Sequence, residues 1–126
     1  MKLIAGNANK KGHYSPGVLV GNILYISGQL PIDPETGQLA AGDIEAQTKA
    51  ALGNVERVLT AAGLAKTDVA MCRVYIPDMA YWDTVNDIYA DFFGEHKPAR
   101  VIVPTRELHH GALVEIEAMA EKREDP

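Results

Sequence analysis

The chain has little cysteine, few aromatic residues and few basic residues. Its 126 residues include one cysteine, Cys72, which excludes an internal disulfide and a zinc site built from several thiolates. Aromatic residues make up 6% of the chain, so aliphatic side chains must fill the core. The 12 Lys and Arg residues are outnumbered by 17 Asp and Glu residues, for a formal net charge of −5. This balance disfavours a broad surface for nucleic acid, which needs clustered basic residues.

Long hydrophobic runs are also missing. No stretch approaches the ~20 apolar residues of a membrane-spanning helix, and residues 1–7 lack the apolar stretch of a signal peptide. Together with the single cysteine, this predicts a cytoplasmic protein in a reducing compartment. The length and the ordinary content of hydrophobic (47%) and charged (23%) residues predict a single domain over residues 1–126.

Hydrophobic periodicity predicts five strands and two helices in the order ββ, αβ, αββ. Gly21 and Asn22 form a two-residue hairpin signal between two strands, and residues 33–37 read as a turn. Asp43 and Asp78 are expected N-caps, and the glycines that follow each apolar pattern end the helices. The strands are expected at residues 18–20, 23–26, 69–76, 98–103 and 114–120, and the helices at about 44–62 and 79–93.

Two helices can cover only one face of a single sheet, so the predicted fold class is a two-layer α+β structure. The strand at 69–76 then exposes one of two alternating sets of residues. One set is Val69, Met71, Arg73 and Tyr75, and the other is Ala70, Cys72, Val74 and Ile76. Both sets contain apolar side chains, and an uncovered apolar face indicates an interface. A homo-oligomer is therefore expected.

The last two strands carry charges, which are costly inside a sheet unless they are paired or functional. Arg100 has a planar guanidinium suited to binding a carboxylate, and Glu115 is a candidate proton acceptor. Alternation places Glu115 and Glu117 on the same face of their strand. The alternative is an ion pair between Arg100 and one of these glutamates across neighbouring strands. The pattern alone favours that ion pair.

Several short motifs occur in order over nearly the whole chain. They are Ser27-Gly28-Gln29-Leu30-Pro31, Asp33-Pro34-Glu35-Thr36-Gly37, Asn54-Val55, Ala61-Ala62-Gly63-Leu64, Val85-Asn86-Asp87-Ile88-Tyr89, Phe92-Phe93, Pro98-Ala99-Arg100 and Glu115-Ile116-Glu117-Ala118. This ordered set closely resembles the RidA (YjgF/Rid) family of 2-enamine/2-imine deaminases. The resemblance implies a chorismate-mutase-like α+β fold. It also implies a homotrimer with a central barrel and three sites between subunits.

The resemblance also implies roles for particular residues. Arg100 would hold the substrate carboxylate, Glu115 would position a water, and Tyr14 would complete the catalytic group. The remaining substrate-binding residues would be Ser27, Gly28, Asn86 and Ile102. The family archetype has cysteine where this chain has Ile102; there the backbone N–H does the binding, so isoleucine can substitute.

These roles imply hydrolytic deamination of 2-enamine or 2-imine acids, such as 2-aminoacrylate, to 2-oxo acids and ammonia. No metal or organic cofactor is expected, and neither a nucleic acid nor a membrane is an expected partner. Three alternatives remain: a non-catalytic trimeric binder of small carboxylates, a deaminase of a larger unsaturated amino acid such as 2-aminomuconate, and a ribonuclease or translation inhibitor.

Other chemically distinctive residues favour structural roles. His109 and His110 are expected in a surface loop, and Cys72 is expected in the core. The pair Tyr81-Trp82 is expected to fill the core or an interface.

Overall fold

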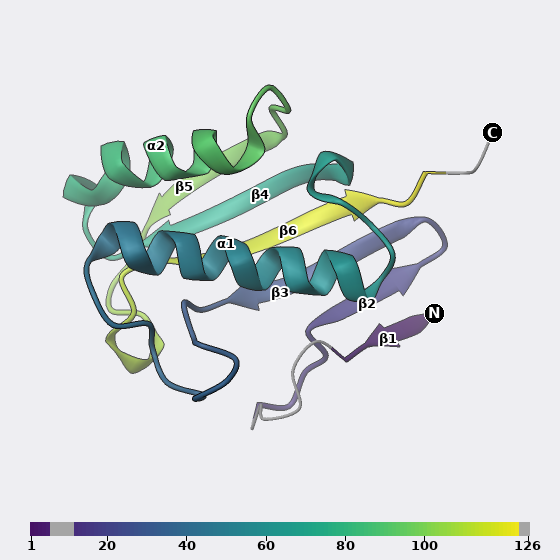
Figure 1. The fold of residues 1–126 in the computed structure, drawn as a ribbon, viewed down its shortest axis with the longest axis horizontal. Coiled ribbons are helices and arrows are strands. Elements are labelled where there is room, and N and C mark those ends of the chain that lie inside the picture. Colours follow the sequence, from purple (N-terminus) through teal and green to yellow (C-terminus); the bar gives the residue numbers. More distant parts are fainter. Residues whose placement is uncertain (6–11, 124–126) are drawn as a thin grey trace.

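The computed structural model describes residues 1–5 and 12–123, which form a six-stranded sheet with two helices on one face (Figure 1). The strands are β1 (Lys2–Ile4), β2 (Gly17–Val20), β3 (Ile23–Gln29), β4 (Val69–Ile76), β5 (Ala99–Pro104) and β6 (Glu115–Glu121). The helices are α1 (Ile44–Ala61) and α2 (Trp82–Phe93). The predicted α+β class with two helices over a single sheet is confirmed.

The strand order across the sheet is β1-β2-β3-β6-β4-β5. All neighbouring pairs are antiparallel except β4 and β5, which are parallel and joined through α2. A parallel pair needs such a crossover because a tight turn can join only antiparallel strands. As a result β5 is an edge strand, and β4 separates it from β6.

Strand β1 was not predicted. It has three residues and pairs with β2 at the other edge of the sheet. Only Ile4 of this strand is buried, while Leu3 is 63% exposed. So short a segment with one buried side chain carries no alternation long enough to recognise in the sequence.

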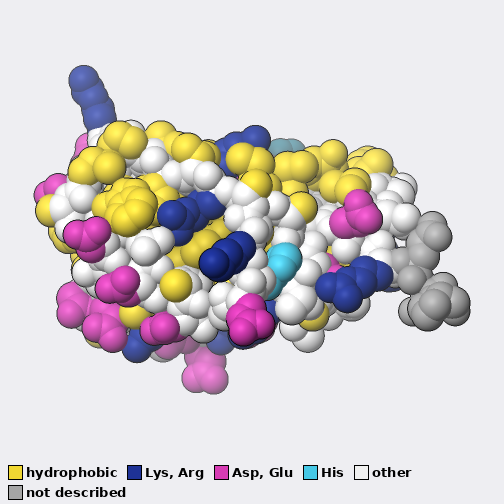
Figure 2. Space-filling model, turned by 90° about the horizontal axis from the view of Figure 1, so that it is seen from above, with side chains coloured by type: hydrophobic (Ala, Val, Ile, Leu, Met, Phe, Trp, Pro, Cys, Tyr) yellow, Lys and Arg dark blue, Asp and Glu magenta, His cyan; other side chains and the backbone are white. Residues whose placement is uncertain are grey.

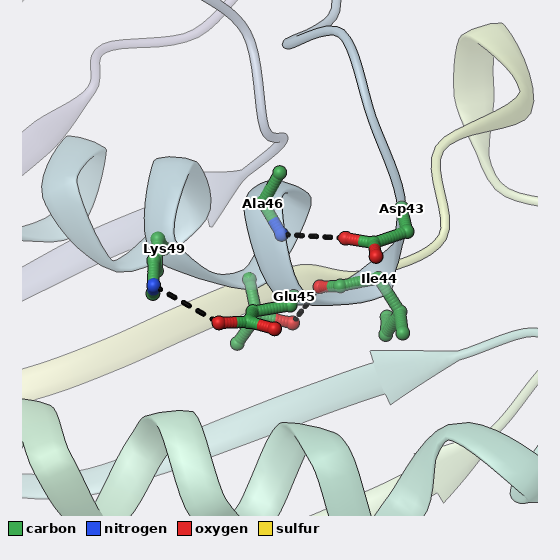
Figure 3. A network of polar contacts seen from close by, with 6 residues as sticks. Asp43, Ile44, Glu45, Ala46 and Lys49 are labelled. Atoms are coloured by element: carbon green, nitrogen blue, oxygen red, sulfur yellow. Dashed lines mark hydrogen bonds and ion pairs between the residues drawn. The ribbon is translucent and has the colours of Figure 1, made fainter.

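The predicted turns and helix ends are confirmed. Gly21 and Gly37 both have positive φ, as the hairpin and the turn require. At the start of α1 the Asp43 carboxylate accepts a hydrogen bond from the N–H of Ala46 at 3.1 Å (Figure 3). The same view shows the ion pair between Glu45 and Lys49, one turn apart.

Helix α1 ends in a Schellman motif. Gly63 has φ +80°, the N–H of Leu64 donates to the carbonyl of Leu59 at 2.9 Å, and the N–H of Gly63 donates to that of Thr60 at 3.0 Å. The start of α2 differs slightly from the prediction: Asp78 caps a 3-10 turn (Met79–Tyr81) that leads into the α-helix.

The core lies between the sheet and the helices. On β4 the inward residues are Val69, Cys72, Val74 and Ile76, each at most 1% exposed. Neither predicted alternating set is correct over its full length, because the pairing with β6 shifts register between Val69 and Met71. This irregularity turns Val69 inward and leaves Ala70 exposed.

The other face of the sheet has no covering layer among the described residues. The register places several exposed apolar side chains on it: Leu3 (63%), Tyr25 (47%), Val20 (46%) and Val101 (41%). Figure 2, seen from above, shows hydrophobic side chains in a row along one border and acidic side chains gathered toward the opposite one. The bare apolar face on which the oligomer prediction rests is therefore present.

Candidate active site

Arg100 lies on β5 and points toward α2. In the parallel pairing it is in register with Cys72, which is fully buried under the helices. The Arg100 Nη1 donates a hydrogen bond to Asn86 Oδ1 at 2.9 Å. Its Cζ lies 4.9 Å from the ring centroid of Tyr89 and 5.5 Å from that of Trp82. The half-buried guanidinium is therefore bound to one polar and two aromatic side chains of α2.

Two less polar groups lie behind the guanidinium. Burial raises the pKa of the Cys72 thiol, while its hydrogen bond with Tyr89 and the positive charge of Arg100 act in the opposite direction. Burial also raises the pKa of Tyr89, which is 6% exposed. The hydroxyl of Tyr89 has no oxygen or nitrogen partner among residues 1–5 and 12–123. Cys72 is thus a core residue, as predicted, and it lies beside the arginine site.

The ion pair that the pattern alone favoured is wrong. Glu115 and Glu117 lie on β6, two strands from β5, which is about 10 Å. They also face the uncovered side of the sheet, since they pair with Tyr75 and Arg73, whereas Arg100 faces the helices. The sequence alone does not reveal this separation of Arg100 from the two glutamates, because it depends on the strand order, which places β4 between β5 and β6.

Glu115 packs against the backbone of Gly28. A Cβ atom built on Gly28 would lie 2.5 Å from Glu115 Oε2. Burial raises the pKa of Glu115, the negative charge of Glu117 raises it further, and His109 acts in the opposite direction. Both effects make this carboxylate a stronger base than an exposed glutamate, as general-base chemistry requires.

Glu117 has different surroundings. It accepts a hydrogen bond from the Tyr75 hydroxyl, and its Oε2 lies 3.5 Å from Arg73 Nη1. The hydrogen bond to Glu117 is the main cause that raises the pKa of Tyr75. Glu117 is therefore bound by side chains of its own chain, whereas the side chain of Glu115 forms no hydrogen bond or ion pair with residues 1–5 and 12–123.

Ser27, next to Gly28, forms two hydrogen bonds with the loop that carries Tyr14. The Ser27 hydroxyl donates to the carbonyl of Ser15 at 2.6 Å, and its N–H donates to that of Pro16 at 2.9 Å. Tyr14, which precedes Ser15 in this loop, is 50% exposed. These contacts fix the loop against the end of β3, next to Gly28.

The expected site residues therefore fall into two groups within one chain. The arginine group contains Arg100, Asn86 and Ile102, which is on the same side of β5 as Arg100. The glutamate group contains Glu115, Gly28 and Ser27, with the Tyr14 loop beside them. The two groups lie on opposite faces of the sheet, so one chain does not bring Arg100 and Glu115 together.

The described part of the chain contains no cluster of three or more His, Cys, Asp or Glu side chains that could hold a metal ion. His109 and His110 are exposed, as predicted, with ring centroids 3.8 Å apart in a 3-10 turn before β6. None of the described helices is both long enough and apolar enough to span a membrane.

Comparison with known proteins identifies the family. The model of the family described as Endoribonuclease L-PSP matches residues 6–122. The chain belongs to the RidA (YjgF/RutC) family. It is 47% identical to a RutC family protein of Pyrococcus horikoshii over 111 residues, covering 88% of each chain. It is 41% identical to a human protein named 2-iminobutanoate/2-iminopropanoate deaminase over 109 residues, covering 86% of this chain and 80% of the human one.

Solved structures agree with this membership of the RidA family. The Escherichia coli YjgF gene product superposes with a TM-score of 0.91 at 38% identity, covering 98% of this chain and 100% of that one. Escherichia coli TdcF, solved with bound serine, gives a TM-score of 0.92 at 34% identity with the same coverage. The family is confirmed, and so is an α+β fold shared with solved members of that family.

In this RidA-family chain, sequence reasoning missed the contact of Trp82 and Tyr89 with the arginine. Trp82 was expected to fill the core or an interface. The available signal was the spacing of Trp82, Asn86 and Tyr89, which recur at i, i+4 and i+7 and so share one helix face. That pattern is also typical of core packing, and Tyr89 is indeed in the core with Trp82 packed against it; their additional contact with Arg100 depends on where β5 places the guanidinium.

Proposed function

We propose that the protein hydrolyses small 2-imino acids, or their 2-enamine tautomers, to 2-oxo acids and ammonia. The observation that carries this proposal is the presence in one chain, on opposite faces of the sheet, of a half-buried arginine with donors that no described residue accepts and a partly buried carboxylate of raised pKa. The name of the human relative supports a small 2-imino acid as substrate, and the serine bound to TdcF supports a ligand with a carboxylate.

Arg100 would bind the substrate carboxylate. A guanidinium has five N–H donors, and the described residues accept one of them, through Asn86. The other donors can form the bidentate, charge-assisted hydrogen bonds that a carboxylate accepts. The backbone N–H groups of Gly28 and Ile102 would help to orient the substrate.

Glu115 would act on the water. Its raised pKa suits a base that takes a proton from water as the oxygen attacks the imine carbon. The proton taken from water passes to the imine nitrogen, which gives the carbinolamine. Glu115 then transfers the hydroxyl proton to the same nitrogen as the C=O bond forms, and the C–N bond breaks with its electrons leaving on ammonia. The products are ammonia and the 2-oxo acid, and the atoms balance with one water consumed.

The complete site would form between two copies of the chain. Arg100 and Glu115 face opposite sides of one sheet, so a substrate that contacts both needs Arg100 from one copy and Glu115 from another. The uncovered face with its exposed apolar side chains provides a surface for such assembly. A homotrimer with its sheets around a central barrel, and with Tyr14 and Ser27 completing each site, fits this requirement.

The three alternative functions would each need different features of this chain. A non-catalytic carboxylate binder needs Arg100 and has no use for the basicity of Glu115. A deaminase of a larger substrate uses the same residues with a wider pocket. Cleavage of RNA, which the family description names, would need a basic surface, and the net charge of −5 offers little support for one.

The test is release of ammonia and 2-oxo acid from a panel of 2-imino acids generated in the assay. Activity is expected on small members of the panel, with loss in Arg100→Ala. Arg100→Lys should also lose most activity, because lysine cannot form the planar bidentate contact. Absence of turnover over the whole panel, with carboxylate binding retained, would establish the binder instead.

A further inference from the structure

The face of α2 that meets β5 carries three different side chains around one guanidinium. Trp82, Asn86 and Tyr89 are four and three residues apart, so the helical repeat of 3.6 residues stacks them on one side of α2. All three contact Arg100: Asn86 through a hydrogen bond of 2.9 Å, and the two rings at 4.9 and 5.5 Å from its Cζ. Both ring distances lie within the ~6 Å range of cation–π attraction.

We propose that Trp82 and Tyr89 are positioning residues that hold the guanidinium of Arg100 in the orientation that binds a carboxylate. This inference rests on the proposed carboxylate role of Arg100. An arginine on an edge strand has many rotamers, and fixing one of them costs conformational entropy each time a ligand binds. Contacts that fix the side chain beforehand remove that cost, so affinity for the carboxylate increases.

The three side chains of α2 contact the guanidinium of Arg100 in different ways. Asn86 accepts one N–H of Arg100, whereas the two rings contact the guanidinium without using any of its donors. The remaining donors therefore stay available. The Tyr89 hydroxyl has no oxygen or nitrogen partner among the described residues and interacts with the Cys72 thiol instead, so it is not bonded to the guanidinium. The ring face, and not the hydroxyl, is what Tyr89 contributes.

The experiment compares Trp82→Leu with Phe92→Leu. Phe92 is a matched control, because it is also a half-buried aromatic residue of α2 with a cation over its ring, Lys66 Nζ at 4.7 Å. Pyruvate binding by NMR titration, kcat and KM for the 2-imino acid that forms pyruvate, and thermal unfolding are measured for each variant. Trp82→Leu should raise both the pyruvate Kd and KM about 3- to 10-fold, with a smaller effect on kcat. Phe92→Leu should leave both unchanged.

Conservative variants separate positioning from packing. Trp82→Phe keeps a ring face and should recover most of the affinity lost in Trp82→Leu. Tyr89→Phe removes only the hydroxyl and should retain affinity, whereas Tyr89→Leu should lose it. An unchanged pyruvate Kd and KM in a folded Trp82→Leu protein would overturn the inference, and so would a loss confined to kcat.

Two further measurements distinguish a failure of this inference from a failure of the proposed function. Arg100→Ala tests the proposed function by itself: wild-type pyruvate affinity in that variant would mean that the proposed carboxylate site is wrong, whatever Trp82 does. If Trp82→Leu does not fold, NMR of the arginine Nε–H groups in the wild type decides the question. The Arg100 signal, identified by its loss in Arg100→Lys, should be shifted by the aromatic rings and exchange slowly. An unshifted, rapidly exchanging signal would overturn the inference.

Discussion

Replacing Gly28 by alanine places a methyl group against the carboxylate of Glu115. The new Cβ would lie 2.5 Å from Oε2 and 3.1 Å from Cδ, whereas ordinary contacts begin near 3.4 Å, so Oε2 must move by about 0.9 Å. Gly28 does not have the positive φ that would disfavour alanine. Because the atom that must move is the end of a flexible side chain, the folded structure should tolerate the change.

The effect on catalysis should be much larger than the effect on stability. A misplacement of about 1 Å in a reacting group can cost ~10²-fold in rate, so Gly28→Ala should lower kcat by about that factor. Steady-state deamination, with thermal unfolding measured in parallel, checks this. Gly53→Ala is the matched control, since a Cβ there meets nothing closer than 3.6 Å. Full turnover in a folded Gly28→Ala protein would refute the reasoning that ties activity to the position of Glu115.

Three further outcomes are expected. Glu115→Gln should lower kcat by ~10²–10⁴-fold while pyruvate still binds. Glu117→Gln, which loses contacts with Tyr75 and Arg73, should instead alter stability or assembly more than rate. Equal losses of kcat in the two variants would contradict the different roles of these glutamates. In the pH profile of kcat/KM, the acidic limb should lie above the ordinary pKa of glutamate. In Glu117→Gln this limb should move to lower pH, because removing the neighbouring negative charge lowers the pKa of Glu115. An acidic limb at the same pH in both proteins would contradict this assignment of the base. Gly53→Ala should raise the free energy of unfolding by about 0.5–1 kcal/mol in denaturant titration, since the position is in the interior of α1 and has room for a Cβ; destabilisation would contradict it.

The same raised pKa links Glu115 to folding. A carboxyl group that binds its proton more tightly in the folded state favours folding at low pH. This contribution is fully present below the ordinary pKa of about 4.3 and is lost as pH rises through the raised folded pKa of Glu115. In Glu115→Gln this part of the pH dependence of stability should disappear.

Most of the fold could be predicted because its signals are local. The hairpin at Gly21, the cap at Asp43 and the helix end at Gly63 each depend on a few adjacent residues, and the structure confirms all three. The features that were missed depend on pairing between distant segments. Strand β1 exists through its pairing with β2, and the burial of Val69 follows from a register shift against β6.

The arrangement of the candidate site also depends on pairing between distant segments. The sequence identified Arg100 and Glu115 as unusual charges within strands, and the family motifs gave each a role. Their placement on opposite faces follows from the strand order, in which β4 separates β5 from β6. The contacts of Arg100 with Trp82 and Tyr89 also depend on how α2 crosses β5, which helical periodicity alone does not specify.

Complementation between two inactive variants shows whether Arg100 of one copy and Glu115 of another act on the same substrate. Arg100→Ala and Glu115→Gln are each expected to be inactive alone. Proteins carrying different affinity tags are co-expressed in equal amounts, and the mixed oligomers are purified through both tags. In a trimer that contains both variants, one of its three sites combines an intact Arg100 with an intact Glu115 from the neighbouring copy, so about a third of the sites should be active, with activity in proportion. Mixed oligomers as inactive as the two parents would contradict the account.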